Sequence, residues 1–259
     1  MKNFLFFPIL LLSIFSVVSC QKETTKEAPE RSLIVLVKDK SASISQSNAE
    51  QEKEIKHLTH YLNQNLIENT DVVVMDIDSH SGSRTNTMWY KFKAPRVQEA
   101  TRVQSESEKE LEQTFYQSKV RRTLKATQKK IIQQLYDTAS SSNQTAIVEL
   151  LHPISEILKN FDKASICVYS DFIQESNFRD FTNGSWAMPS KAYATDLAKT
   201  DFDRLQQQGY EIDLSKVTSF DVVTPNNPEN DKYYVSMPYY WDTILGLGKF
   251  TGTINWQKL

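Results

Sequence analysis

Residues 33–43 read Leu-Ile-Val-Leu-Val-Lys-Asp-Lys-Ser-Ala-Ser, an unbroken apolar run that ends in a carboxylate and two hydroxyls. Strands of a parallel sheet are buried on both faces, so they appear as continuous apolar runs rather than as alternating patterns. Further runs of this kind occur at Val72–Ile77, Ile166–Tyr169 and, more weakly, Val217–Val223. The sequence therefore predicts a sheet of buried parallel strands.

Helical patterns lie between these runs, at Asn48–Leu66, Ser105–Tyr136, Ala146–Leu158 and Lys191–Gln208. Strands that alternate with helices favour an α/β fold, with a doubly wound, mostly parallel sheet and helices on both faces. The segment Met88–Lys93 alternates more clearly, and we expect it to form one antiparallel edge strand.

Two further segments could be interpreted as binding sites, but their patterns favour a structural role. The helix expected at Ser105–Tyr136 has only a thin apolar stripe, and its many basic residues are typical of a solvated face rather than an anion-binding surface. The stripe comprises Leu111, Phe115, Leu124, Ile131 and Leu135, and the basic residues are Lys119, Arg121, Arg122, Lys125, Lys129 and Lys130. The aromatic stretch from Tyr233 to Trp256 predicts a final helix that caps the core, with a sugar-stacking platform as the alternative.

Residues 1–19 have the pattern of an export signal: Lys2 precedes an apolar core that is too short to cross a bilayer comfortably. Residues 17–20, Val-Val-Ser-Cys, resemble the cleavage box of bacterial lipoproteins. The resemblance implies lipidation of Cys20 and a location in the cell envelope, with the outer membrane favoured. An ordinary secretory signal is the alternative.

Residues 20–31 are polar and are expected to form a disordered tether. The tripeptide Gln21-Lys22-Glu23 partly resembles a Bacteroidetes signal for surface display, which leaves the periplasmic or outer face open. Residues 32–259 suit one domain, with insertions near 79–104 and 172–209. Removal of Lys2 leaves 29 basic and 32 acidic residues and a net charge of 29 − 32 = −3, which excludes a general nucleic-acid binder. Cys167 lies in an apolar run, so we expect a buried thiol and no disulfide.

Candidate metal ligands follow two of the predicted strands. Asp39, Ser41 and Ser43 stand directly after the first strand, where doubly wound sheets bind ligands. Asp171 follows the strand at residues 166–169, and Thr145 ends a polar loop. If these two strands are neighbours, two carboxylates and several hydroxyls meet at one edge of the sheet. Oxygen-only sites of this kind suit Mg²⁺.

In this arrangement the chain resembles the von Willebrand factor A-type domain with its metal-ion-dependent adhesion site. The resemblance covers roughly residues 32–250 and implies direct metal binding by Ser41, Ser43 and, in some states, Thr145. It implies that Asp39 and Asp171 act mainly through bound water. The expected cofactor is Mg²⁺, with Mn²⁺ or Ca²⁺ as alternatives, and the expected ligand is an acidic side chain of a partner protein.

Three positions depart from the family pattern: Ala42, Gln144 and Phe172 stand where glycine is frequent. Because glycine permits tight turns, the departures bear on the loop geometry and on metal affinity. A structural or envelope-scaffold lipoprotein with a degenerate metal site is therefore the alternative to a metal-dependent binding module.

An enzyme hypothesis rests on residues 72–79, Val-Val-Val-Met-Asp-Ile-Asp-Ser, which resemble the nucleophile motif of haloacid-dehalogenase-type phosphatases. In this hypothesis Asp76 would attack phosphorus and Asp78 would act as acid and base, with Mg²⁺ held by Asp171. The motif normally lies on the first strand, so we expect no catalytic activity. His57 and His60 lie three residues apart on a helix and are expected to be surface residues.

Overall fold

The computed structural model describes residues 29–41, 47–78, 81, 90–98, 105–137, 142, 144–183 and 190–259. The export signal, Cys20 and nearly all of the predicted tether lie outside these residues, as do Ser43 and most of the insertion expected at 79–104. In the part of the chain that is described, no helix is both long enough and apolar enough to cross a membrane.

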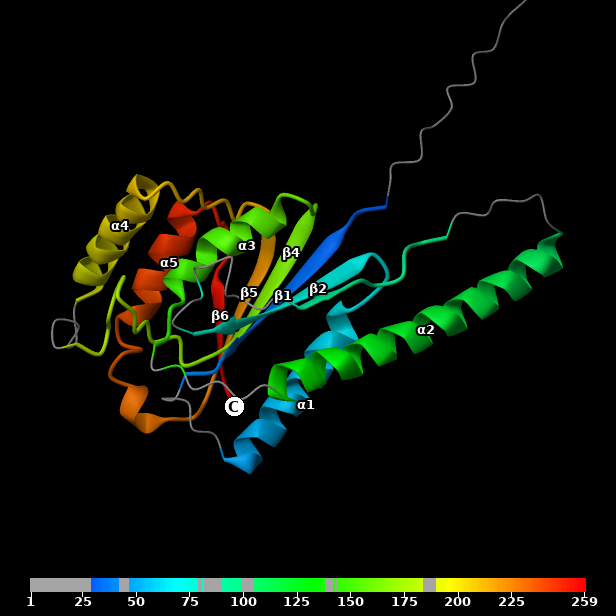
Figure 1. Cartoon of the computed structure of the whole chain (residues 1–259), viewed down its shortest axis with the longest axis horizontal. Coiled ribbons are helices and arrows are strands. Elements are labelled where there is room, and N and C mark those ends of the chain that lie inside the picture. The colour runs from blue at the N-terminus through cyan, green and yellow to red at the C-terminus, as the bar shows by residue number, and fades with distance from the viewer. Residues whose placement is uncertain are drawn as a thin grey trace, which may run out of the picture.

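Within the described residues, six strands form one sheet in the order β3-β2-β1-β4-β5-β6 (Figure 1). Neighbouring strands are parallel except for β2 and β3, which pair antiparallel at one edge. The strands are β1 (Ser32–Asp39), β2 (Thr70–Ile77), β3 (Tyr90–Phe92), β4 (Lys163–Tyr169), β5 (Val217–Thr224) and β6 (Ile254–Lys258). The predicted doubly wound sheet with an antiparallel edge strand is therefore confirmed.

Helices cover both faces of the sheet because successive side chains of β1 point to opposite sides. Ile34 and Leu36 pack with α1 (Asn48–Asn65) and α2 (Glu106–Asp137). Leu33, Val35 and Val37 pack in the larger core on the other face. That core includes η1 (Val148–Leu150), α3 (Leu151–Leu158), α4 (Lys191–Gln207) and α5 (Met237–Leu247), and η3 (Pro228–Asn230) precedes α5. In Figure 1, α4 lies outside α5, against which it packs.

The C-terminal prediction is only half right. The expected final helix is α5, which buries Tyr240 and Trp241 completely and so caps the core. The chain then continues into β6, which the sequence did not predict, and Trp256 lies on this strand. The strand has only two apolar residues, Ile254 and Trp256, because it lies at the edge of the sheet and needs little apolar surface.

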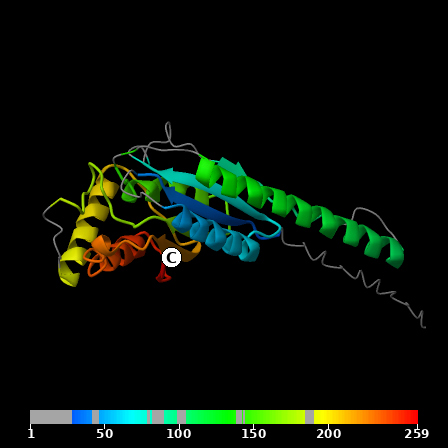
Figure 2. The same cartoon turned by 90° about the horizontal axis from the view of Figure 1, so that it is seen from below.

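The stripe expected along α2 also needs correction. Ile131 and Leu135 are buried, but Leu111 and Phe115 are 59% and 68% exposed. The physical reason is that the N-terminal half of α2 runs past the sheet, as Figures 1 and 2 both show. The expectation of a solvated basic face is confirmed, since all six basic side chains between Lys119 and Lys130 are exposed.

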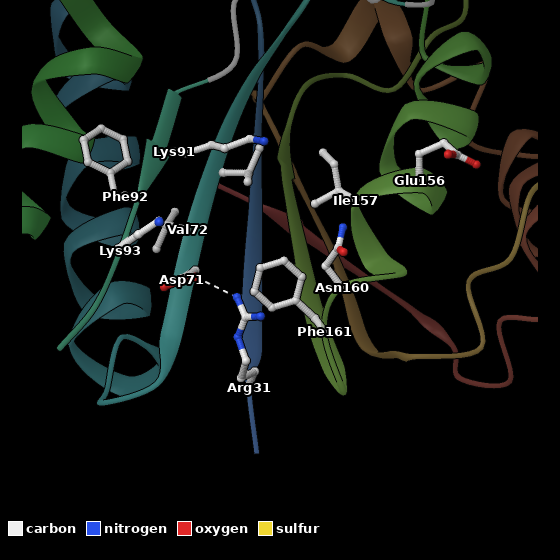
Figure 3. Close-up of a pocket in the computed structure, with 11 residues that line it drawn as sticks. Arg31, Asp71, Val72, Lys91, Phe92, Lys93, Glu156, Ile157, Asn160 and Phe161 are labelled. Carbon is white, nitrogen blue, oxygen red and sulfur yellow. Dashed lines mark ion pairs between the residues drawn. The ribbon is translucent and has the colours of Figure 1, made fainter. Parts of the chain in front are cut away.

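Arg31, which was predicted to belong to the tether, is instead fixed to the domain. The Arg31 backbone N–H donates to Asp162 Oδ2 at 2.7 Å, and its guanidinium lies 3.5 Å from Asp71 and 4.9 Å from the centre of the Phe161 ring. Figure 3 shows that Arg31, Asp71 and Phe161 line a cavity between β2 and α3, whose volume is 550 Å³. This cavity lies at the amino ends of the strands, opposite the predicted ligand edge.

Candidate metal site at the carboxyl ends of two strands

Strands β1 and β4 are hydrogen-bonded neighbours, and their register places Lys38 opposite Tyr169. Asp39 and Ser170 come next on the two strands, so Asp39 and Asp171 reach the same edge of the sheet. From β1 the strand order runs outward in both directions, to β2 on one side and to β4 on the other. This edge is therefore the topological switch point at which doubly wound sheets bind ligands.

Asp39 is only 2% exposed, and each of its carboxylate oxygens accepts a hydrogen bond. Ser41 N–H donates to Oδ1 at 2.8 Å, and Ser170 Oγ donates to Oδ2 at 2.6 Å. Burial raises the pKa of Asp39, and the hydrogen bonds from Ser170 and Ser41 oppose that shift. Lys38 points to the other face of the sheet, where its Nζ donates to Glu54 at 2.5 Å.

Asp171 is 6% exposed and also receives two hydrogen bonds from uncharged donors. Ile173 N–H donates to Oδ1 at 3.1 Å, and Asn230 Nδ2 donates to Oδ2 at 2.9 Å. Burial, and then the negative charge of Asp39, raise the pKa of Asp171 to about 7. The two carboxylates are therefore close enough to repel each other.

The loop that carries Thr145 is fastened to the segment after Asp171. Thr145 N–H donates to the Glu175 carbonyl at 2.8 Å, and Glu175 N–H donates back at 2.9 Å. The buried Gln174 side chain accepts hydrogen bonds from Ile147 N–H and Val148 N–H at 2.8 and 2.9 Å, which fixes the start of η1. Burial and the charges of Asp180 and Asp39 raise the pKa of Glu175. The segment after Asp171 therefore adds a third carboxylate near the edge.

The turn after Asp171 forms although Phe172 stands where the adhesion-site motif often has glycine. Phe172 has a φ of 62°, in the left-handed region that favours glycine. Its ring lies 4.3 Å from that of Trp241, whose Nε1–H donates to the Phe172 carbonyl at 3.1 Å. Aromatic packing and this hydrogen bond hold the bulky residue in a conformation that is otherwise costly.

The structure thus brings four of the five predicted site residues to one edge of the sheet: Asp39, Ser41, Thr145 and Asp171. Ser41 joins the same region by bridging to Ser142 in the Thr145 loop, and Ser43 lies outside the described residues. Ser170, Glu175 and Asn230 also lie at this edge and were not predicted as site residues. Ser170 precedes Asp171 and could have been predicted from the same position at the end of a strand. Asn230 lies in the segment after β5, and no local sequence pattern marks it.

The donor atoms at this edge fit a hard divalent cation. They are carboxylate and hydroxyl oxygens, which Mg²⁺ prefers. Neither Asp39 nor Asp171 forms an ion pair with a described residue, so their charges are not balanced there. However, no group of three or more Asp, Glu, His or Cys side chains among the described residues is arranged to hold a metal ion by itself. A cation at this edge would therefore also need hydroxyl and water ligands.

Asp76 and Asp78, the catalytic residues of the phosphatase hypothesis, lie away from Asp171. Asp76 is on β2, and β1 separates that strand from β4 and Asp171. Lys40 Nζ lies 3.0 Å from Asp76, which occupies the carboxylate with an ion pair. Asp78 N–H donates to Ser81 Oγ at 2.8 Å.

The expectation for His57 was wrong, whereas His60 is exposed as expected. His57 is half-buried, and its ring nitrogens lie 3.0 Å from Tyr169 Oη and 3.0 Å from Gln257 Oε1. It thereby connects α1 to β4 and β6, a contact that depends on the unpredicted strand. Cys167 is fully buried, as expected, and burial raises the pKa of its thiol.

No protein-family model matches the chain, and no curated protein matches it. Solved structures similar to it include the SpRpn10 VWA domain, at 11% identity and a TM-score of 0.36 over 89% of this chain and 88% of that one. Two structures of proximal thread matrix protein 1 from the mussel byssus are 13% and 11% identical, with TM-scores of 0.36 and 0.37. Those matches cover 85% of this chain but only 44% of the mussel protein. At such TM-scores, the fold rests on the observed strand order alone.

Proposed function

We propose that the domain is a binding module that recognises a protein partner through a divalent cation at the edge formed by β1 and β4. The observation that carries this proposal is the pair of buried carboxylates, Asp39 and Asp171, with the Asp171 pKa raised to about 7. Two such groups at a switch point need a cation or a shared proton. The resemblance to the adhesion-site motif in the sequence supports the cation.

In this proposal, Ser41 and Thr145 contribute hydroxyl oxygens and Asp39 and Asp171 hold the cation mainly through water, with Ser43 as a further ligand. The bound cation would supply an incompletely neutralised positive charge. An acidic side chain of the partner would complete its coordination, because a charge-assisted contact is strong where water is partly excluded. In this proposal the domain binds its partner and catalyses no reaction.

We further propose that lipid on Cys20 holds this module at the cell envelope, in the outer membrane. The support is the lipoprotein-like box at residues 17–20. Metabolic labelling with a tagged fatty acid tests it: label must appear in the full chain and be absent from the Cys20→Ala variant. Label in both would show that the attachment is elsewhere.

Titration with Mg²⁺ and Mn²⁺, followed by calorimetry and thermal melting of the chain from Gln21 onward, tests the metal site. The parent is expected to bind saturably and to melt at a higher temperature with metal, as ligand binding to the folded state requires. The Ser41→Ala, Asp171→Ala double variant is expected to lose both effects. An unresponsive parent would refute the proposal and leave an envelope scaffold with a degenerate site.

Asp76→Asn is the matched control, because it removes a carboxylate from the neighbouring strand while leaving Asp39 and Asp171 in place. Metal binding is expected to persist in this variant. If the parent instead hydrolyses a phosphate ester and Asp76→Asn abolishes that turnover, the protein is a phosphatase and the binding-module proposal fails.

A further inference from the structure

Helix α2 is much longer than the part of it that the domain covers. Its 32 residues span about 48 Å at 1.5 Å per residue. From Val120 onward the helix packs on α1 and the sheet through buried residues such as Val120, Ile131 and Leu135. The N-terminal half projects beyond the sheet, as both views show (Figures 1 and 2). Leu111 and Phe115 lie on this projecting half and are mostly exposed.

The exposed apolar pair belongs to a continuous outer face of α2. With about 100° between successive residues, Leu111, Arg122 and Ala126 all lie within roughly 40° of Phe115 around the helix. Val120, Ile131 and Leu135 lie on nearly the opposite side and are buried against the domain. The outer face therefore points away from the domain along the whole helix.

Charge changes sign along this same helix. Residues 106–118 contain Glu106, Glu108, Glu110 and Glu112 and one basic residue, Lys109, whereas residues 119–130 contain six basic residues and no acidic one. The basic side chains form no ion pairs with the described residues. Each half of α2 is thus complementary in charge to the other half of an identical helix.

We propose that two copies of the chain associate through the outer faces of their α2 helices, which run antiparallel. A single register satisfies the whole face: Phe115 meets Arg122 of the second copy, Leu111 meets Ala126, and the two-fold axis passes near Ser118 and Lys119. In that register Glu108 lies opposite Lys129. Every one of these side chains is exposed in the single chain.

The chemistry of each contact supports this register. A guanidinium stacks favourably on an aromatic ring, so Arg122 is a suitable partner for Phe115. Ala126 leaves room for the larger Leu111. A two-fold axis repeats every contact, so each charge pair occurs twice. Because the outer face lies opposite the domain, the two domains are carried on opposite sides of the helix pair and do not collide.

A second copy explains the charge pattern better than an unrelated acidic or basic partner, because either of those would be repelled by one half of the helix. The contact between residues 108 and 129 extends over about 32 Å. Such a pair of single helices lies near the lower end of specific interfaces in area. The dimer is therefore expected to be reversible and to weaken with salt, since its charge pairs are exposed.

Sedimentation velocity of the full chain in mild detergent tests the proposal, with protein concentration and salt varied. The parent is expected to dimerise at low salt. Glu108→Lys, and separately Lys129→Glu, are expected to weaken dimerisation at least tenfold. An equimolar mixture of these two variants is expected to associate again, because each exchanged charge then lies opposite a charge of the other sign. The variant that carries both substitutions is expected to recover for the same reason.

Disulfide crosslinking tests the register independently. Lys119→Cys is expected to form a crosslinked dimer under mild oxidation, because the two copies of this position meet at the axis. Gln113→Cys is the matched control, since Gln113 is equally exposed but lies on the other side of the helix. A parent that stays monomeric at all concentrations, a Glu108→Lys, Lys129→Glu double variant that does not recover, or crosslinking of both cysteines alike would overturn the proposal.

Discussion

Two buried acidic sites in this molecule are built on opposite principles. Asp201 on α4 is completely buried and is paired with Arg179, whose Nε donates to Oδ2 at 2.7 Å and whose Nη2 donates to Oδ1. Tyr240 Oη adds a third hydrogen bond at 2.9 Å. Asp39 and Asp171 at the sheet edge are nearly as buried, but the hydrogen bonds they receive come from uncharged donors.

The charge of Asp201 is balanced by Arg179, whereas no described residue forms an ion pair with Asp39 or Asp171. The first arrangement stabilises the packing of α4 against α5. The second has a charge that, under the proposed function, a cation from solution would neutralise. Removal of one charged group should therefore destabilise the first site and stabilise the metal-free form of the second.

The largest effect is expected from Arg179→Met. Removal of the guanidinium leaves Asp201 as a buried, unpaired charge, which costs about 3–5 kcal/mol of folding free energy. Urea unfolding at neutral pH measures the loss. Lys199→Met, which removes an exposed pair with Asp196 on the same helix, is the control and should change stability little. Equal losses in the two variants would show that burial does not distinguish the pairs.

Asp171→Asn is expected to stabilise the metal-free protein by about 2 kcal/mol at pH 8. The pKa of Asp171 in the folded protein is raised to about 7, above its unfolded value of 3.8. The folded state therefore holds a proton more tightly than the unfolded state, and stability falls as the pH rises from about 4 to 7. Asparagine cannot ionise, so this fall is removed.

Melting temperatures of parent and Asp171→Asn in a chelator, between pH 4 and 8, check this prediction. The advantage of the variant should grow with pH and level off above pH 7. Addition of Mg²⁺ at pH 8 should then stabilise the parent alone. A constant difference across the pH range would mean that Asp171 does not titrate in this interval.

The smallest effect is the difference between two substitutions in the turn that holds Asp171. Phe172→Gly and Phe172→Ala both remove the ring that packs on Trp241, and each is expected to cost about 3–5 kcal/mol. Because φ is 62° at this position, the glycine variant should be more stable than the alanine variant by about 1 kcal/mol. Chemical unfolding of the two variants measures the difference. A more stable alanine variant would show that the turn relaxes after the ring is lost.

The sheet and four members of the candidate site were predictable because they depend on local patterns. Buried parallel strands are continuous apolar runs, and their ends place Asp39 and Asp171 by topology alone. The strand β6 was missed because Asn255, Gln257 and Lys258 give an edge strand little apolar character. The aromatic residues between Tyr233 and Trp256 therefore predicted a helix and no strand after it.

The remaining parts of the two acidic sites depend on contacts between distant segments. Asn230 reaches Asp171 across 59 residues, and Arg179 meets Asp201 across 22. No spacing rule within one helix or strand connects such pairs. The projection of α2 was likewise hidden, because its apolar stripe continues beyond the surface that it could cover.

The central position of β1 has a consequence for the order in which the protein acquires its structure. One edge of β1 pairs with β2, which follows it closely in the chain, but the other pairs with β4, where Leu33 meets Ala164. Until the residues up to β4 have been made and exported, an apolar strand edge stays open to other chains. Folding of the domain should therefore wait for the second half of the chain, and the nascent first half is the state most in need of a chaperone.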